Sequence, residues 1–187
     1  MIDSVVSKMR RTVDHEIINE LDNATHVVST TQNIITPELI AQLKSYLTTN
    51  RVPNDGNITL LCGPSMFASL TSQTTFTNSL YTKNSPAAVD QNKPAWEDKP
   101  MKFVWQGMNI IESPIVPINS STNIETCFMF HKNAIGSAMD MNDSNPNAAV
   151  QMGADGKERQ QWTNAYFKTA NKIIQNDGII KIPFKTL

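Results

Sequence analysis

The stretch Thr126-Cys-Phe-Met-Phe-His-Lys-Asn-Ala-Ile-Gly-Ser-Ala-Met139 decides the fold of this chain. Its apolar run from Cys127 to Phe130 is typical of a strand that is buried on both faces, and Phe130 is expected in the core. The polar residues 131–133 predict a tight helical turn. At Gly136 the backbone is expected to need a positive φ or a close backbone contact that a Cβ atom would prevent. The stretch therefore predicts a strand, a turn and a second strand.

Two short motifs invite comparison with enzyme active sites, and neither is complete. His131 could act as a base, but no partner accompanies it in the sequence, and we interpret it and Lys132 as residues that cap or solvate the turn. Ser65 follows a predicted strand and a Gly-Pro turn, but a nucleophile elbow needs G-x-S-x-G and position 67 is Phe. We interpret Ser65 as the N-cap of a short helix. A hydrolase-like enzyme that uses Ser65 or His131 is kept as an alternative.

The composition argues against several classes of protein. The chain has 187 residues, a formal net charge of −1 and 18% charged residues, so any contact with DNA should be weak and non-specific. Cys62 and Cys127 lie in apolar runs and are predicted to be small buried hydrophobes. We predict no catalytic, metal or cofactor site, because His, Cys, Asp and Glu do not recur at ligand spacing. No apolar run approaches the ~20 residues of a membrane span.

Local patterns predict the order of helices and strands. Apolar residues at spacings of three and four predict a helix over residues 3–21. Thr36-Pro37-Glu38 begins a second helix that ends near Thr49, because Thr is a favoured N-cap and Pro a favoured first helical residue. Residues 22–33 should form a loop or a short edge strand. Strands are predicted, in chain order, at residues 58–62, 102–106, 108–111, 148–152 and 179–182, with a bend at Gly107 between the second and third.

Four pieces of the sequence occur in an order that resembles a known family. A "W-x-G" strand at Trp105-Gln-Gly107 is followed by a variable loop, by the unit Cys127 to Ala138 and by a closing Gly178-Ile-Ile-Lys-Ile182 strand. The N-terminal segment from Arg10 to Ile18 resembles the end of a long "spine" helix. Together these pieces resemble the C-terminal part of tailed-bacteriophage major capsid proteins.

The resemblance implies an α+β fold with antiparallel sheets, a long N-terminal helix, and axial and peripheral lobes. Residues 1–21 would be a remnant of the spine helix that packs with the peripheral lobe, residues 22–125 the axial lobe, and residues 126–187 the peripheral strands and the C-terminal strand. The implied function is structural: self-assembly into the icosahedral head that encloses phage DNA, in the virion, after assembly in the cytoplasm of the bacterial host. A non-viral shell or tail protein of the same fold is the main alternative.

The implied partners are other copies of the subunit, in hexamers and pentamers, together with scaffold and portal proteins. Trp96, in a long predicted loop over residues 83–100, is either a tether onto the body or an interface anchor. Trp96, Arg10 and Arg11 are the candidate interface residues. The family's N-terminal arm and extended hairpin have no match in the sequence. Residues 1–187 alone are therefore expected to form monomers or small rings rather than closed shells, since stable interfaces bury more than about 1,000 Å².

Overall fold

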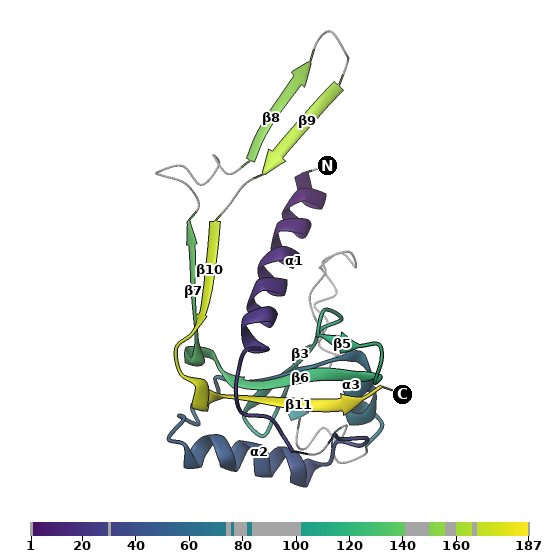
Figure 1. The fold of residues 1–187 in the computed structure, drawn as a ribbon, viewed down its shortest axis with the longest axis vertical. Helices are drawn as coiled ribbons and strands as arrows, with labels where there is room; N and C mark the ends of the chain where they lie inside the picture. Colours follow the sequence, from purple (N-terminus) through teal and green to yellow (C-terminus); the bar gives the residue numbers. More distant parts are fainter. Residues whose placement is uncertain are drawn as a thin grey trace.

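The computed structural model of the protein describes residues 2–29, 31–73, 76, 82–83, 102–140, 150–155, 160–165 and 168–186. Within them, a body of sheet and helices carries a long helix and narrow β-ribbons that project from it (Figure 1). The body and the projecting part meet where the first helix ends and where the last strand begins.

The body is built on a seven-stranded sheet in the order β11-β6-β1-β4-β3-β2, with β5 paired to β6. Its strands are β1 (Ile58–Cys62), β2 (Thr82–Lys83), β3 (Lys102–Trp105), β4 (Met108–Glu112), β5 (Ile118–Asn119), β6 (Ile124–His131) and β11 (Ile179–Lys185). Every pair is antiparallel except β1 with β4, which is parallel. The predicted antiparallel arrangement therefore holds for the sheet apart from that one pair.

Both faces of this sheet are covered by helices. Alternate residues of β1, β6 and β11 point to one face and pack against α2 (Pro37–Thr49) and α3 (Pro64–Thr71). The opposite face carries Phe128 and packs against Ile18 and Leu21 at the end of α1 (Ile2–Leu21). The central strands are therefore buried on both sides, as the apolar run that includes Cys127 and Phe128 predicts.

The projecting part consists of α1 and two β-ribbons. After β6, the short helix η2 (Lys132–Ala134) leads into β7 (Ile135–Asp140), which pairs with β10 (Lys168–Ile173) in an antiparallel ribbon. Helix α1 runs beside this ribbon and contacts β10 (Figure 1). A second antiparallel ribbon, β8 (Val150–Asp155) with β9 (Gln160–Ala165), lies beyond the N-terminal end of α1. The chain then returns through η3 (Asn176–Gly178) to β11.

Several sequence predictions are confirmed. The Thr36 side chain accepts a hydrogen bond from the Leu39 N–H at the start of α2, and Pro37 is its first residue. The central stretch forms the predicted strand, helical turn and strand, and His131 caps that turn by accepting the Asn133 N–H. The segment predicted as a loop or an edge strand covers the edge of β11, through isolated bridges from Val27 and Gln32.

Three predictions about single residues are wrong. Phe130 is only half-buried, because the fully buried aromatic residue of β6 is Phe128. The N-cap of α3 is Gly63, which has no side chain to cap the helix, so Ser65 lies inside the helix. Gly136 has no positive φ, and a Cβ atom there would meet the flexible end of the Ile174 side chain at 2.7 Å rather than backbone.

The bend predicted at Gly107 is a two-residue hairpin turn between β3 and β4. Gln106 has φ 47° and Gly107 has φ 77°, and positive φ at both central positions is the type I′ arrangement. The Lys44 ammonium of α2 donates a hydrogen bond to the Gln106 carbonyl oxygen at 2.6 Å. This turn fixes the register in which Trp105 lies opposite Met108.

We expect Gly107→Ala to lower the free energy of unfolding by roughly 1–2 kcal/mol, the cost of a left-handed conformation for an L-residue. Gly136→Ala should cost less, because the exposed Ile174 side chain can move aside. Urea denaturation of the two variants measures the difference. A larger loss for Gly136→Ala would mean that close packing in the ribbon matters more than the turn.

The division into an axial and a peripheral lobe stays a prediction. The expected boundary at residue 125 falls within β6, and the sheet that holds β1 and β4 also holds β6 and β11. The sheet thus takes strands from both expected segments.

Candidate assembly surface

Polar contacts tie the end of α1 to the ribbon. The Glu20 carboxylate accepts the Ile173 N–H at 3.1 Å and lies 3.4 Å from the Lys172 ammonium. The Ile173 N–H and the Asn23 side chain are the main reasons that the pKa of Glu20 is lowered. Two residues later, just after the end of α1, the Asp22 carbonyl oxygen accepts a hydrogen bond from the Lys181 ammonium at 2.8 Å. The angle between α1 and the sheet is therefore fixed by specific bonds as well as by apolar packing.

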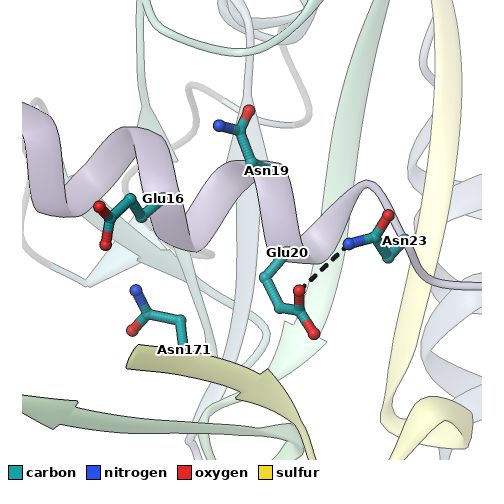
Figure 2. A pocket seen from close by; sticks show the side chains of 5 residues that line it. All are labelled: Glu16, Asn19, Glu20, Asn23 and Asn171. Atoms are coloured by element: carbon teal, nitrogen blue, oxygen red, sulfur yellow. Dashed lines mark hydrogen bonds between the residues drawn. The ribbon is translucent and has the colours of Figure 1, made fainter. Parts of the chain in front are cut away.

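A shallow pocket opens between α1 and β10. All the residues that line it carry a carboxylate or a carboxamide group: Glu16, Asn19, Glu20, Asn23 and Asn171 (Figure 2). Glu20 is occupied by internal bonds, whereas the Asn171 Oδ1 atom is buried without a hydrogen-bond partner in the described part of the chain. Two exposed members of this lining, Glu16 and Asn19, present one negative charge and one carboxamide to whatever lies against this surface.

Of the three candidate interface residues, the structure describes the side chain of one. Arg11 is exposed on α1 and takes part in an interaction within the chain. Arg10 lies in α1 with its side chain outside the described residues, and Trp96 lies wholly outside them. The roles of all three stay predictions. Lys8, also exposed, adds positive charge to the N-terminal half of α1.

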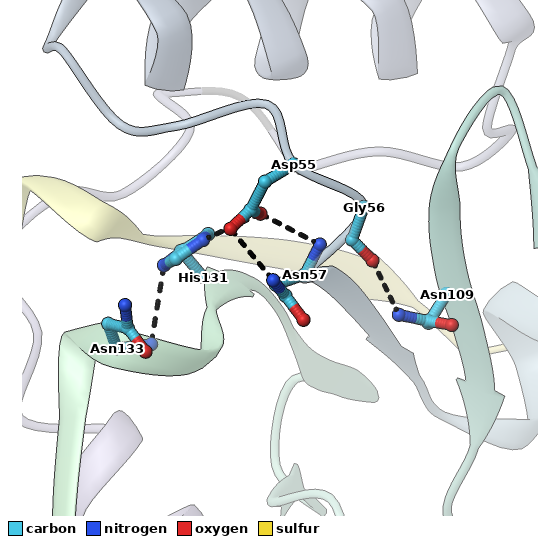
Figure 3. Close-up of polar contacts among 6 residues, drawn as sticks. All are labelled: Asp55, Gly56, Asn57, Asn109, His131 and Asn133. Carbon is cyan, nitrogen blue, oxygen red and sulfur yellow. Dashed lines mark hydrogen bonds and ion pairs between the residues drawn. The ribbon is translucent and has the colours of Figure 1, made fainter.

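A polar network of side chains surrounds the N-terminal end of β1, where Ile58 pairs with His131. His131 is 2% exposed, and its Nε2 atom lies 3.1 Å from Asp55 Oδ1. Its Nδ1 atom accepts the Asn133 N–H, so Nε2 carries the proton and donates it to Asp55 (Figure 3). Asn57 donates two further bonds to Asp55. The bonds from the Asn57 side chain and from His131 lower the pKa of Asp55 to about 2.

This network predicts an acid-sensitive contribution to stability. The folded-state pKa of Asp55 lies below its ordinary value of 3.8, so the contribution is complete above about pH 4 and is lost as the pH falls towards 2. Urea denaturation between pH 5 and 2 should show this loss in the wild type and a flatter dependence in Asp55→Asn. Asp14→Asn, an exposed change on α1, is the control. Equal pH dependence in the two variants would contradict the assignment.

A buried carboxylate holds α3 in place. Glu125 on β6 is 0% exposed and accepts the N–H of Met66 at 2.6 Å and that of Ser65 at 3.4 Å, both in the first turn of α3. A Cβ atom at Gly63 would lie 2.6 Å from the Glu125 Cδ atom, so only glycine leaves room for this carboxylate. A carboxylate at the N-terminus of a helix is favoured by both the free N–H groups and the helix dipole.

The two cysteines border this carboxylate and behave as the sequence predicts. Cys62 and Cys127 are buried and free. Burial raises the pKa of the Cys127 thiol to about 12 and that of Cys62 well above its ordinary value. The Cys127 sulfur accepts the Gly63 N–H at 3.2 Å. Both thiols therefore act as packing groups of the core.

Sequence reasoning missed Glu125 as the cap of α3. Two signals could have found it: a helix that begins Gly-Pro-Ser with no capping side chain of its own, and a lone carboxylate in a largely apolar strand. Their partnership joins residues 59 apart in sequence, which no local pattern reveals.

The arrangement of Ser65 and His131 gives no catalytic pair. Ser65 follows the C-terminal end of β1, whereas His131 lies opposite Ile58 at the start of β1. The two ends of this strand are about 13 Å apart, at roughly 3.3 Å per residue. Both the N–H of Ser65 and the ring of His131 are engaged in structural bonds. Among the described residues, no group of three or more His, Cys, Asp or Glu side chains is placed to hold a metal ion. None of the described helices has the length and hydropathy that a membrane span requires.

Solved structures share this fold. A chain of Mycobacterium phage Che8 superposes with a TM-score of 0.64 at 15% identity, over 97% of this chain and 61% of that one. The holo-SrpI encapsulin of Synechococcus elongatus gives 0.60 at 14% identity, over 98% and 63%. The capsid structure of cyanophage P-SCSP1u gives 0.50 at 10% identity, over 100% and 67%. The chain spans less than two thirds of the length of the first two.

Family membership rests on the sequence match. No curated protein matches the chain significantly. A sequence model of the family described as phage capsid protein matches residues 1–186, almost the whole chain. The α+β fold, the projecting N-terminal helix and the structural neighbours agree with that match. The chain therefore belongs to the phage capsid protein family.

Proposed function

We propose that the chain is the shell-forming part of a major capsid subunit, which self-assembles into an icosahedral head around phage DNA. The observation that carries the proposal is the family match over residues 1–186. The fold supports it, because the capsid structure of a cyanophage superposes over the whole of this chain with a TM-score of 0.50. The role is structural and non-enzymatic, and the protein acts in the virion after assembly in the host cytoplasm.

The mechanism depends on repetition of the same contacts. In a closed shell, every copy presents the same surfaces to its neighbours, so a modest polar contact is multiplied by symmetry. The pocket between α1 and β10 and the exposed basic residues of α1 supply charges of opposite sign on one element. We propose that this element contributes to contacts between subunits, together with Trp96, Arg10 and Arg11. Scaffold and portal proteins are the further expected partners.

Charge reversal on α1 tests this part of the proposal. Glu16 is exposed, and Glu16→Lys should leave folding intact while it reduces the fraction of protein in assembled particles. Glu38→Lys, an exposed glutamate on α2, is the matched control. Mass photometry of both variants, in the protein with any segments that flank these residues, gives the particle fraction. Equal assembly of both variants would exclude the α1 pocket as a contact.

Contact with DNA should be weak, since a net charge of −1 offers no broad surface for phosphates. We expect no sequence-selective binding in a mobility-shift assay at physiological salt. Nanomolar, sequence-selective binding would contradict a purely structural role.

A non-viral shell is the second candidate, because the encapsulin match has a TM-score close to that of the Che8 match. The contents of the particles separate the two functions. Particles that protect DNA of uniform length from nuclease would indicate a phage head. Closed particles without protected DNA would indicate a shell of the encapsulin type.

A further inference from the structure

Three polar side chains from separate parts of the fold form a continuous hydrogen-bonded chain. His26 follows the end of α1, Tyr46 lies on α2 and Asp177 lies in η3. The Tyr46 hydroxyl is 2.8 Å from His26 Nδ1, and His26 Nε2 is 3.0 Å from Asp177 Oδ1. The two rings meet edge to face, with centroids 5.6 Å apart.

The backbone on both sides of this chain is anchored. The His26 carbonyl oxygen accepts the Lys181 N–H at 2.8 Å. Next to it, the Thr25 N–H donates to Asn176 Oδ1 at 3.1 Å, and the Asn176 amide donates back to the Thr25 hydroxyl. The residues immediately before His26 and before Asp177 are therefore bound to each other. The imidazole is held between its two partners by the fold.

The chemistry of the partners sets the direction of the chain. A carboxylate only accepts hydrogen bonds, so the His26 Nε2 atom carries a proton and donates it to Asp177. The Nδ1 atom of the neutral ring then carries a lone pair, which accepts a hydrogen bond from the Tyr46 hydroxyl. The hydroxyl donates to the imidazole, and the other imidazole nitrogen donates to a carboxylate. Enzymes that activate a nucleophilic hydroxyl use these three groups in the same order.

Tyr46 is accessible to a reagent. The residue is 40% exposed, so Tyr46 lies at the surface rather than in the core. Nothing in the proposed shell function requires this arrangement, and it involves neither Ser65 nor His131.

We propose that Tyr46 is a site of covalent modification by small acyl or sulfonyl electrophiles, with His26 as the base and Asp177 as the residue that positions it. With a sulfonyl fluoride, the Tyr46 oxygen forms a bond to sulfur and the S–F bond breaks. The phenolic proton passes to His26 Nδ1, fluoride leaves, and the imidazolium is stabilised by Asp177 until it returns the proton to water. No oxidant or metal takes part.

Labelling with phenylmethylsulfonyl fluoride tests the proposal, with modified peptides quantified by mass spectrometry. In the folded protein, Tyr46 should react about tenfold faster than in the same chain unfolded in urea. This is less than the 10²–10⁴-fold effect of well-positioned general bases, because the site is partly exposed. His26→Gln should abolish that advantage, because a carboxamide can keep both hydrogen bonds but cannot take the proton. Asp177→Asn should reduce it in part.

Folding and proton transfer are separated by two controls. Circular dichroism and melting temperature should be the same for the wild type and His26→Gln, so that a loss of labelling reports the lost base. Wild-type labelling should also be slower in heavy water, an effect that His26→Gln should lack. Equal labelling of Tyr46 in wild type, His26→Gln and unfolded chain would overturn the proposal. Labelling confined to Ser65 would overturn it as well and would revive a serine-dependent activity.

Discussion

Replacing Phe128 by Ala should lower the free energy of unfolding by about 3–5 kcal/mol, the usual cost of truncating a buried aromatic side chain. Phe128 is 0% exposed and packs in the cluster that joins the sheet to the end of α1, with Ile18, Leu21 and Ile179. The cavity would open where the body meets the projecting helix. The change should therefore also loosen α1.

Phe130→Ala is the matched control for this experiment. Phe130 lies two residues along the same strand, on the same face, and is half-buried. It should lose clearly less stability than Phe128→Ala in urea denaturation. An equal or larger loss for Phe130→Ala would show that the cluster is centred elsewhere. Hydrogen exchange of the last turn of α1 should rise in Phe128→Ala and reports the loosening directly.

Glu125→Leu should also be strongly destabilising, by about 1–3 kcal/mol for each of the two N–H groups that lose their acceptor. These are the N–H groups of Ser65 and Met66 in the first turn of α3. Leucine has a similar size and suits the buried site, so the loss isolates the missing bonds. Glu16→Leu, an exposed change on α1, should be close to neutral. Comparable stability of the two variants would show that the carboxylate does not hold the helix.

A double-mutant cycle tests the close approach of Gly63 to Glu125. Gly63→Ala should cost about 1–3 kcal/mol in the wild type, as overpacking of a filled core usually does. The cost should be much smaller in Glu125→Ala, where the carboxylate that a Cβ atom would meet at 2.6 Å is gone. Strictly additive effects would mean that the glycine is needed for another reason.

The sequence predicts those elements whose signals are local. Thr36-Pro37-Glu38 contains its own N-cap and first turn, so α2 is found with its start correct. The apolar runs of β1, β6 and β11 are long enough to identify buried strands without knowledge of their neighbours. The turn at residues 132–134 follows from the change to polar residues after that run.

The remaining features depend on contacts between distant residues. The apolar run from Cys127 to Phe130 does not distinguish Phe128 from Phe130, and only the packing of the folded chain makes Phe128 buried and Phe130 half-buried. The cap of α3 comes from Glu125, and the partner of His26 lies 151 residues away. Because the parallel pairing of β1 with β4 depends on the crossover between them, it too is invisible to local patterns.

The central claim, that the chain is a capsid subunit, is tested most directly by electron cryo-microscopy of purified particles. The particles should come from cells that produce the protein with any segments that flank residues 1–187. We expect closed shells in which α1, the seven-stranded sheet and the β7–β10 ribbon fit the density of every subunit. We expect the α1 surface that carries Glu16 to face a neighbouring copy. A protein that stays monomeric at every concentration and forms no shell would contradict the assignment as a capsid subunit.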